Sequence, residues 1–156
     1  MALLTAPRWP WFALGASLAM LAAAHAFQQF GGLAPCMLCL KQRDVYWGAA
    51  AVAVASLLFV RGKPGLARIA VIMLGLVFLA GAAVAAYHVA VEQKWVIAQC
   101  EAADLSGITT LGQSGSVSMP KCDEPAWVMF GISMAGYNAL ISLALAGLSF
   151  MAARRA

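Results

Sequence analysis

The chain has 156 residues, of which 63% are hydrophobic and only 10% are charged. A soluble domain carries about a quarter charged residues, so this composition excludes a soluble globular protein and indicates lipid as the solvent. The formal net charge of +4 does not indicate a nucleic-acid-binding protein, because the basic residues are scattered over short connections and form no stripe. We expect residues 1–156 to form one integral membrane domain.

Four apolar segments of about 20 residues are long enough to cross a bilayer as helices. In chain order they cover about residues 10–30, 43–60, 69–91 and 126–152. Gly31-Gly32 ends the first segment, and a turn that contains Pro64 separates the second from the third. The sequence therefore predicts an all-α membrane protein, a four-helix transmembrane bundle with longer loops at about 31–42 and 92–125.

Prolines and small residues support this division. Pro10, Pro35 and Pro125 each lie near an expected helix start, where a missing backbone N–H is tolerated. Small residues four positions apart, such as Gly131 and Ala135, allow close contact between helices in lipid. We therefore expect a compact bundle.

The basic residues predict the orientation of the bundle. The N-terminal segment, the turn after the second span and the C-terminal tail hold six of the ten basic residues and none of the six acidic ones. These six are Arg8, Arg61, Lys63, Arg68, Arg154 and Arg155. The positive-inside rule places both termini in the cytoplasm and both cysteine-bearing loops outside. Trp9 and Trp11 would then mark the inner membrane interface.

The first segment also has features of a secretory signal peptide. Arg8 precedes an apolar run that reaches the small-residue sequence Ala24-His25-Ala26. The run is longer than a usual signal core, so we expect it to remain as a span. Cleavage would not change the side on which the cysteines lie.

All four cysteines fall in the two longer loops, at Cys36, Cys39, Cys100 and Cys122. Disulfides persist in oxidising compartments, so cysteines outside the cytoplasm are expected to pair. Structural disulfides, exchange-active disulfides and a zinc site are the three interpretations. Zinc sites commonly use two closely spaced pairs, whereas Cys100 and Cys122 are far apart in the sequence with no second histidine nearby. We expect no metal site.

The Cys36-x-x-Cys39 pair favours redox chemistry over a structural role. A two-residue spacing closes a small ring, which restricts the unfolded chain comparatively little. Exchange-active cysteines of low pKa often occur in this motif, at helix N-termini or beside a cation. If a helix begins near Pro35, Cys39 and Arg43 lie one turn apart on the same face. Arg43 would then favour a Cys39 thiolate; the alternative is an arginine that reaches lipid headgroups.

Two further features are open to two interpretations each. Glycine and serine residues fill the stretch between Cys100 and Cys122. They predict a flexible loop that would let Cys122 approach Cys36, or simply a solvated loop. His88 follows Tyr87 at the outer end of the third span. An ionisable residue there is a functional candidate, or it meets water and the C-terminal helix dipole.

At these residues the chain resembles the DsbB family of disulfide bond formation proteins. The resemblance covers essentially the whole length. It includes the Cys-x-x-Cys-x-x-x-Arg that opens the second span, the separated cysteine pair in the second loop and Tyr87-His88 at the end of the third span. The sequence Phe130-Gly131-Ile132-Ser133-Met134, followed by Asn138, also resembles the family's last span.

The resemblance implies a quinone-dependent thiol:disulfide oxidoreductase of the bacterial inner membrane. It would reoxidise a periplasmic thioredoxin-fold protein of the DsbA type and pass the electrons to a membrane quinone. The implied disulfides are Cys36–Cys39 and Cys100–Cys122. The partner would attack Cys100, the released Cys122 would attack Cys36, and Cys39 would be freed as a thiolate beside the quinone. Arg43 and, with a weaker match, His88 would lie near the quinone.

The chain departs from the family at three positions. Met37 replaces a frequent proline, Lys41 an aromatic or apolar residue, and Tyr137 a common tryptophan. The residues between the two cysteines help to set the redox potential of the pair. We therefore expect Met37 to affect this potential and not the route of the electrons. We favour ubiquinone over menaquinone as the acceptor.

Overall fold

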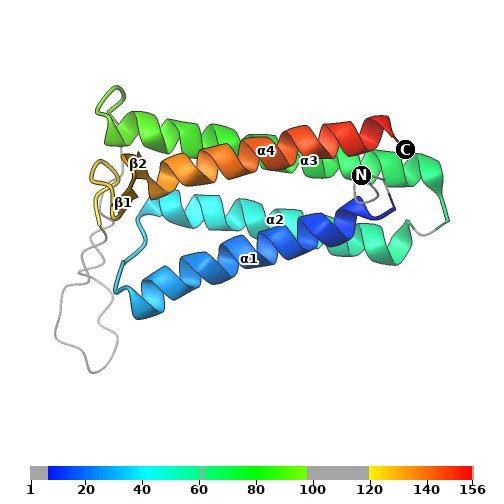
Figure 1. The fold of residues 1–156 in the computed structure, drawn as a ribbon, viewed down its shortest axis with the longest axis horizontal. Coiled ribbons are helices and arrows are strands. Elements are labelled where there is room, and N and C mark those ends of the chain that lie inside the picture. Colours follow the sequence, from blue (N-terminus) through cyan, green and yellow to red (C-terminus); the bar gives the residue numbers. More distant parts are fainter. Residues whose placement is uncertain (1–6, 61, 98–119, 156) are drawn as a thin grey trace, which may run out of the picture.

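The computed structural model describes residues 7–60, 62–97 and 120–155. In these ranges the chain forms four helices, α1 (Trp9–Phe30), α2 (Met37–Phe59), α3 (Pro64–Glu92) and α4 (Met134–Arg154). A short antiparallel hairpin, β1 (Val128–Met129) and β2 (Ile132–Ser133), precedes α4. Figure 1 shows the helices side by side, with the start of α1 and the end of α4 at the same end of the bundle. The predicted all-α architecture is confirmed.

Three of these helices, α1, α3 and α4, are long and apolar enough to cross a membrane. The helix α2 does not reach the same apolarity, because its first turns carry Lys41, Arg43 and Asp44. It nevertheless runs along the length of the bundle beside the other three (Figure 1). Its polar first turns lie at the end of the bundle that holds Cys36 and Cys39, which we call the cysteine end.

Local sequence explains where the helices begin and end. Pro10 and Pro64 occupy the first positions of α1 and α3, where no backbone N–H is required. Gly31 closes α1 with a backbone hydrogen bond to the Phe27 carbonyl. Ser133 caps α4, because its Oγ accepts a hydrogen bond of 3.1 Å from the Gly136 N–H.

The fourth helix begins at Met134, whereas the sequence predicts its start near 126. The hairpin occupies the intervening residues, with Val128 paired to Ser133. Its turn residues Phe130 and Gly131 both have positive φ, 51° and 78°, as in the two-residue turns that suit β-hairpins. Gly131 therefore serves the turn and not the predicted helix contact.

Close helix contacts instead involve glycines of α3. A Cβ on Gly75 would lie 2.8 Å from Cε1 of Phe150 on α4, and one on Gly81 would lie 2.9 Å from Cγ1 of Val45 on α2. Small residues thus bring α3 close to both neighbours.

The two N-terminal tryptophans differ in their environment. Trp11 is 58% exposed, as expected for an interfacial residue, but Trp9 is only 1% exposed. The Trp9 Nε1 donates a hydrogen bond of 2.9 Å to the Ser149 Oγ on α4. Trp9 is therefore a core residue that joins the two ends of the chain, and the prediction that it marks the interface is wrong.

Gly81→Leu is expected to lower stability by about 1–3 kcal/mol, because overpacking forces neighbouring atoms to move. The effect follows from the 2.9 Å approach of a new Cβ to Val45 on the facing helix. Reversible unfolding in mixed micelles measures it. Gly48→Ala is the control, since nothing lies within 4 Å of its Cβ position. Equal stability of the two variants would contradict the close contact.

Candidate functional site

Cys36 and Cys39 lie at the start of α2, with Cys36 as the N-cap residue. The Cys39 backbone N–H donates to the Cys36 Sγ over 3.3 Å, so a thiol sulfur takes the place of the usual capping oxygen. Both residues are free thiols, and their Sγ atoms are 2.8 Å apart. The structure thus holds the reduced form of the pair, and the Cys36–Cys39 disulfide stays a prediction.

The two thiols share their protons unequally. The side-chain hydrogen bond with Cys39 lowers the pKa of Cys36, and His88 and the Cys39 backbone N–H lower it further. Burial raises this pKa, and the net result is a value of about 4. The hydrogen bond to Cys36, together with burial, raises the pKa of Cys39. A thiolate at a helix N-terminus is a common arrangement in exchange-active cysteines. At neutral pH the reduced pair therefore carries its charge on Cys36 and its proton on Cys39.

This assignment predicts an unusual pH profile for Cys36 alkylation in the reduced protein. Only the thiolate is nucleophilic, so the rate should stay nearly constant from about pH 8 to pH 5 and fall as the pH drops through about 4. Peptide mass spectrometry after brief alkylation measures the relative rate, with glutathione as the reference thiol. A rate that falls about tenfold for each pH unit below pH 8, as for an ordinary thiol, would contradict it.

His88 lies deep in the site, with 3% of its surface exposed. Its Nε2 is 3.7 Å from the Cys36 Sγ, and its Nδ1 is 2.8 Å from the Gln42 Nε2. The structure therefore brings His88 to the cysteine pair, and its predicted place near a quinone stays a prediction. A solvated helix end, the alternative interpretation, does not fit this burial.

A chain of buried polar groups continues from Gln42 between α2 and α4. The Asn138 Nδ2 donates to the Gln42 Oε1, and the Asn138 Oδ1 accepts a hydrogen bond of 2.5 Å from the Tyr46 hydroxyl. Ser142 completes the chain, with its Oγ 2.9 Å from the Tyr46 hydroxyl. Buried polar groups need such partners, so these residues hold one another in fixed positions behind His88.

Arg43 lies one turn beyond Cys39 and reaches across to α1. Its Nη1 donates to the Gln28 Oε1 over 2.6 Å, and its Nη2 donates to the Ala24 carbonyl over 3.1 Å. The guanidinium also lines the cavity described below. A guanidinium held by two hydrogen bonds to α1 does not fit an arginine that extends to lipid headgroups.

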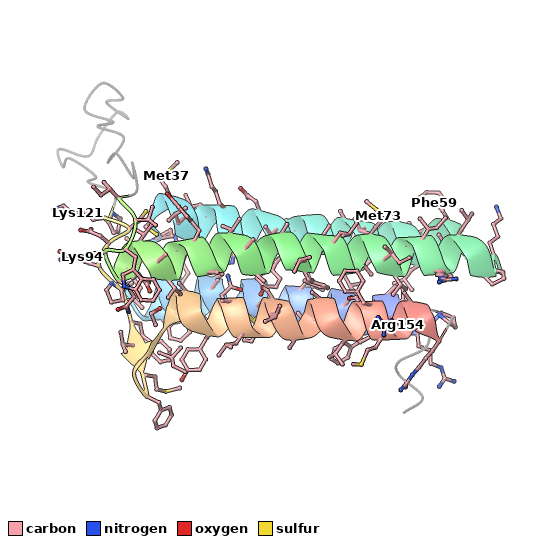
Figure 2. The ribbon with its side chains drawn as sticks, turned by 90° about the horizontal axis from the view of Figure 1, so that it is seen from above. Met37, Phe59, Met73, Lys94, Lys121 and Arg154 are labelled. Atoms are coloured by element: carbon pink, nitrogen blue, oxygen red, sulfur yellow. The ribbon has the colours of Figure 1, made fainter. Side chains whose placement is uncertain are left out.

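Cys122 is disulfide-bonded and only 1% exposed. It belongs to the same buried cluster as Cys36, together with Leu38 and Val91. Figure 2 places Lys121, its neighbour, at the same end of the bundle as Met37. Cys100, its predicted partner, lies outside the described residues, so this pairing stays a prediction. Cys122 needs no long movement to approach Cys36.

An apolar cavity of about 300 Å³ adjoins the cysteine pair and is lined by residues of α1, α2, α4 and the end of α3. Its apolar walls include Leu21 and Phe27 of α1 and Ile141 of α4. Its polar lining comes from Cys36, Cys39, Gln42, Arg43, His88 and Glu92 among others. Its volume is at the lower end of the range for ligand pockets, which combine apolar walls with a few placed polar groups.

The same groups have the composition of a partial metal site. The ligand atoms of Cys36, Cys39 and His88 all lie within 4.8 Å of one another. However, the Gln42 Nε2 can only donate, so the His88 Nδ1 accepts and the proton of the neutral ring is on Nε2. A protonated Nε2 cannot ligate a metal. In the observed arrangement the three residues favour a hydrogen-bonded thiolate.

Sequence reasoning missed Gln28, Gln42, Tyr46 and Glu92 as members of the site, and it noted Asn138 only as a point of resemblance. The available signal was weak: each is a polar residue at the edge of an apolar segment or within one. Intramembrane polar residues are functional candidates, but their facing partners come from other helices. Only packing shows that they converge.

The chain is similar to known proteins over most of its length. A family model described as "Disulfide bond formation protein DsbB" matches residues 7–152. The chain is similar to "Disulfide bond formation protein B 2" of Pseudomonas putida, with 30% identity over 135 residues, which are 83% of this chain and 80% of the relative. No solved structure gives a significant match.

Proposed function

Because the chain belongs to the DsbB family of disulfide bond formation proteins, we propose that it reoxidises a DsbA-type partner and passes the electrons to a membrane quinone. The observation that carries the proposal is the Cys36–Cys39 pair on the wall of an apolar cavity. A dithiol at this position can exchange with a protein disulfide on one side and reduce a lipid-soluble acceptor on the other. A structural disulfide would need no such cavity.

The residues that line the cavity fit a quinone headgroup. The apolar walls of the cavity suit a quinone ring and the start of an isoprenoid tail. Arg43 and His88 place hydrogen-bond donors at the polar side of the cavity. When bound, a quinone supplies an acceptor for two electrons and two protons. Arg43 would bind a quinone oxygen through its guanidinium, and Cys39, one turn before it, would be the neighbouring sulfur. Ubiquinone remains our first choice.

Electrons would enter through the second loop. A thiolate of the partner attacks the proposed Cys100–Cys122 disulfide at Cys100, which forms a mixed disulfide and releases the Cys122 thiolate. Cys122 then attacks Cys36 of the oxidised pair, so the Cys36–Cys39 bond breaks and Cys39 leaves as a thiolate. The shared buried cluster of Cys36 and Cys122 supports this second exchange. The second thiolate of the partner then attacks the mixed disulfide and frees Cys100. The Cys100 thiolate attacks Cys122, so the Cys100–Cys122 bond re-forms and Cys36 and Cys39 are left reduced. Attack on a disulfide sulfur is the chemistry common to all of these steps.

The charge distribution supports a periplasmic position for the cysteine end. Figure 2 shows Arg154 at the end of the bundle opposite to Met37 and Lys121. The positive-inside rule then favours cytoplasmic termini in a bacterial inner membrane and cysteine loops exposed to the periplasm. A DsbA-type thioredoxin-fold protein would meet the cysteines there.

The test is turnover by the purified protein in detergent, supplied with reduced DsbA and either ubiquinone or menaquinone. We expect quinone to be consumed catalytically, with one partner disulfide formed for each quinone reduced. The faster quinone identifies the acceptor class. No turnover with either quinone, together with cysteines that stay reduced and retain zinc, would contradict the proposal and favour a metal-binding protein.

A further inference from the structure

Glu92 is a buried carboxylate at the last turn of α3, on the wall of the cavity. Its side chain is only 5% exposed, and its Oε2 has no hydrogen-bond partner among the described residues. Its Oε1 lies 3.8 Å from the His88 Nε2. Burying an ionised carboxylate with an unpaired oxygen is unfavourable. The position is better suited to a carboxyl group that takes up and releases a proton.

The hydrogen-bond order of the site leaves His88 unable to take this role. Gln42 donates to the His88 Nδ1, and Asn138 in turn donates to the Gln42 Oε1, which fixes the orientation of the Gln42 amide. The neutral ring therefore has its one proton on Nε2, and no free lone pair faces the cysteines. His88 donates a hydrogen bond there and does not act as a base.

The His88 Nε2–H has two possible acceptors at similar distances. The Cys36 Sγ is 3.7 Å away and the Glu92 Oε1 is 3.8 Å away. When Cys36 is part of a disulfide it carries no charge, and among the described residues the Glu92 carboxylate is then the only anion for this donor. When the pair is reduced, a Cys36 thiolate and a Glu92 carboxylate would be two buried anions around one donor. Such like charges favour protonation of one of them.

We propose that Glu92 is the redox-linked proton carrier of this site: it takes up one proton when the Cys36–Cys39 disulfide is reduced and releases it when the pair is reoxidised. The His88 Nε2–H then changes its acceptor from the Glu92 carboxylate to the Cys36 thiolate. Gln42 and Asn138 are positioning residues that keep His88 in the donating tautomer. The inference rests on the proposed function.

The step balances in protons and electrons. Reduction adds two electrons and two protons to the disulfide and the Glu92 carboxylate, which gives the Cys36 thiolate, the Cys39 thiol and the Glu92 carboxylic acid. Reoxidation sends both electrons and both protons to the acceptor, a quinone that becomes a quinol. The thiol of Cys39 supplies one proton and Glu92 supplies the other. Cys36 and Glu92 line the same cavity, so the proton need not cross the protein.

The other charged groups around this cavity do not offer an equivalent site. Arg43 already donates to α1 and does not accept a proton. Lys121 and Glu124 belong to the segment that precedes the hairpin, and both are exposed to solvent. The remaining titratable side chains of the lining are hydroxyls and the second thiol: Tyr46, Tyr137 and Cys39.

Infrared difference spectroscopy of quinone-free protein tests the proposal without turnover. Reduction of the Cys36–Cys39 disulfide with dithiothreitol should produce the C=O band of a protonated carboxyl group. The band should be absent from Glu92→Gln and present in Glu124→Gln, a matched change on the rim of the same cavity. A band that persists in Glu92→Gln, or its absence from the wild-type protein, would overturn the assignment.

The pH dependence of the dithiol–disulfide equilibrium provides a second readout. Near neutral pH, uptake of two protons with two electrons should change the equilibrium constant for reduction of the Cys36–Cys39 disulfide about a hundredfold per pH unit. We expect this dependence in the wild-type protein and in Glu124→Gln. Glu92→Gln should take up only one proton, so the change falls to about tenfold, since each tenfold step corresponds to 29.6 mV for a two-electron couple. An unchanged hundredfold dependence in Glu92→Gln would contradict the proposal.

These outcomes separate the inference from the proposed function. If the protein does not reduce quinone but the carboxyl band and the pH dependence behave as expected, Glu92 is a redox-linked proton site in a protein with another electron acceptor. If quinone turnover is normal and Glu92→Gln changes neither readout, the function holds and the proton carrier is another group.

Discussion

Cys39→Ser is expected to reduce quinone turnover by at least about a thousandfold, as for other residues that act as an obligatory unit in a reaction. Serine cannot form the disulfide with Cys36, so the exchange that delivers electrons to the cavity has no second sulfur. Cys39 is also the thiol that the structure places one turn before Arg43, on the cavity wall. The measurement is quinone consumption with reduced DsbA as the donor.

The same variant should still react with its partner. The proposed Cys100–Cys122 disulfide is untouched, so a mixed disulfide with DsbA should accumulate and be visible by non-reducing electrophoresis. Met37→Leu is the matched control, because Met37 lies between the two cysteines and is partly exposed. It should keep turnover. Full turnover in Cys39→Ser would show that the electrons follow another route.

Arg43→Ala is expected to raise the Michaelis constant for quinone by about 10- to 100-fold with a smaller change in kcat. A hydrogen bond to a charged group contributes about 1.5–3 kcal/mol, and each 1.4 kcal/mol is about a factor of ten in affinity. The guanidinium is a cation at the cavity, held in place by hydrogen bonds to Gln28 and the Ala24 carbonyl. Steady-state kinetics over a range of quinone concentrations separates the two constants.

Two further variants distinguish binding from support of the fold. Arg43→Lys keeps the charge but loses the planar fork, so its Michaelis constant should lie between those of wild type and Arg43→Ala. Gln28→Ala removes one partner and leaves the guanidinium in place, so it should change the constant little. If Arg43→Ala and Gln28→Ala lower thermal stability equally and leave the Michaelis constant unchanged, Arg43 only joins α1 to α2.

The sequence by itself determined the solvent and the architecture of this protein. Apolar runs of about 20 residues, with few charges, match the length of a membrane-spanning helix, which satisfies its own backbone in lipid. Helix starts at Pro10 and near Pro35 were likewise predictable, because capping and proline rules act over a few residues. The pairing of Cys39 with Arg43 on one face followed from helical periodicity alone.

Where the local rules competed, the sequence was less informative. The stretch from Val128 to Ser133 is apolar enough to continue a span, yet Phe130 and Gly131 form the turn of a hairpin and α4 starts only at Met134. Hydropathy counts apolar residues and does not detect a turn in which two successive residues adopt positive φ.

Only the tertiary structure decided which polar residues form the site. His88 and Glu92 belong to α3, Gln42 to α2 and Asn138 to α4, and no sequence spacing relates the three helices. The rotation of each helix about its axis is set by close packing at positions such as Gly81. That packing brings Gln42 within hydrogen-bonding distance of His88, which in turn sets the tautomer that faces Cys36. The redox chemistry of the cysteine pair could be predicted from the sequence, whereas the residues that form hydrogen bonds around it depend on contacts between helices.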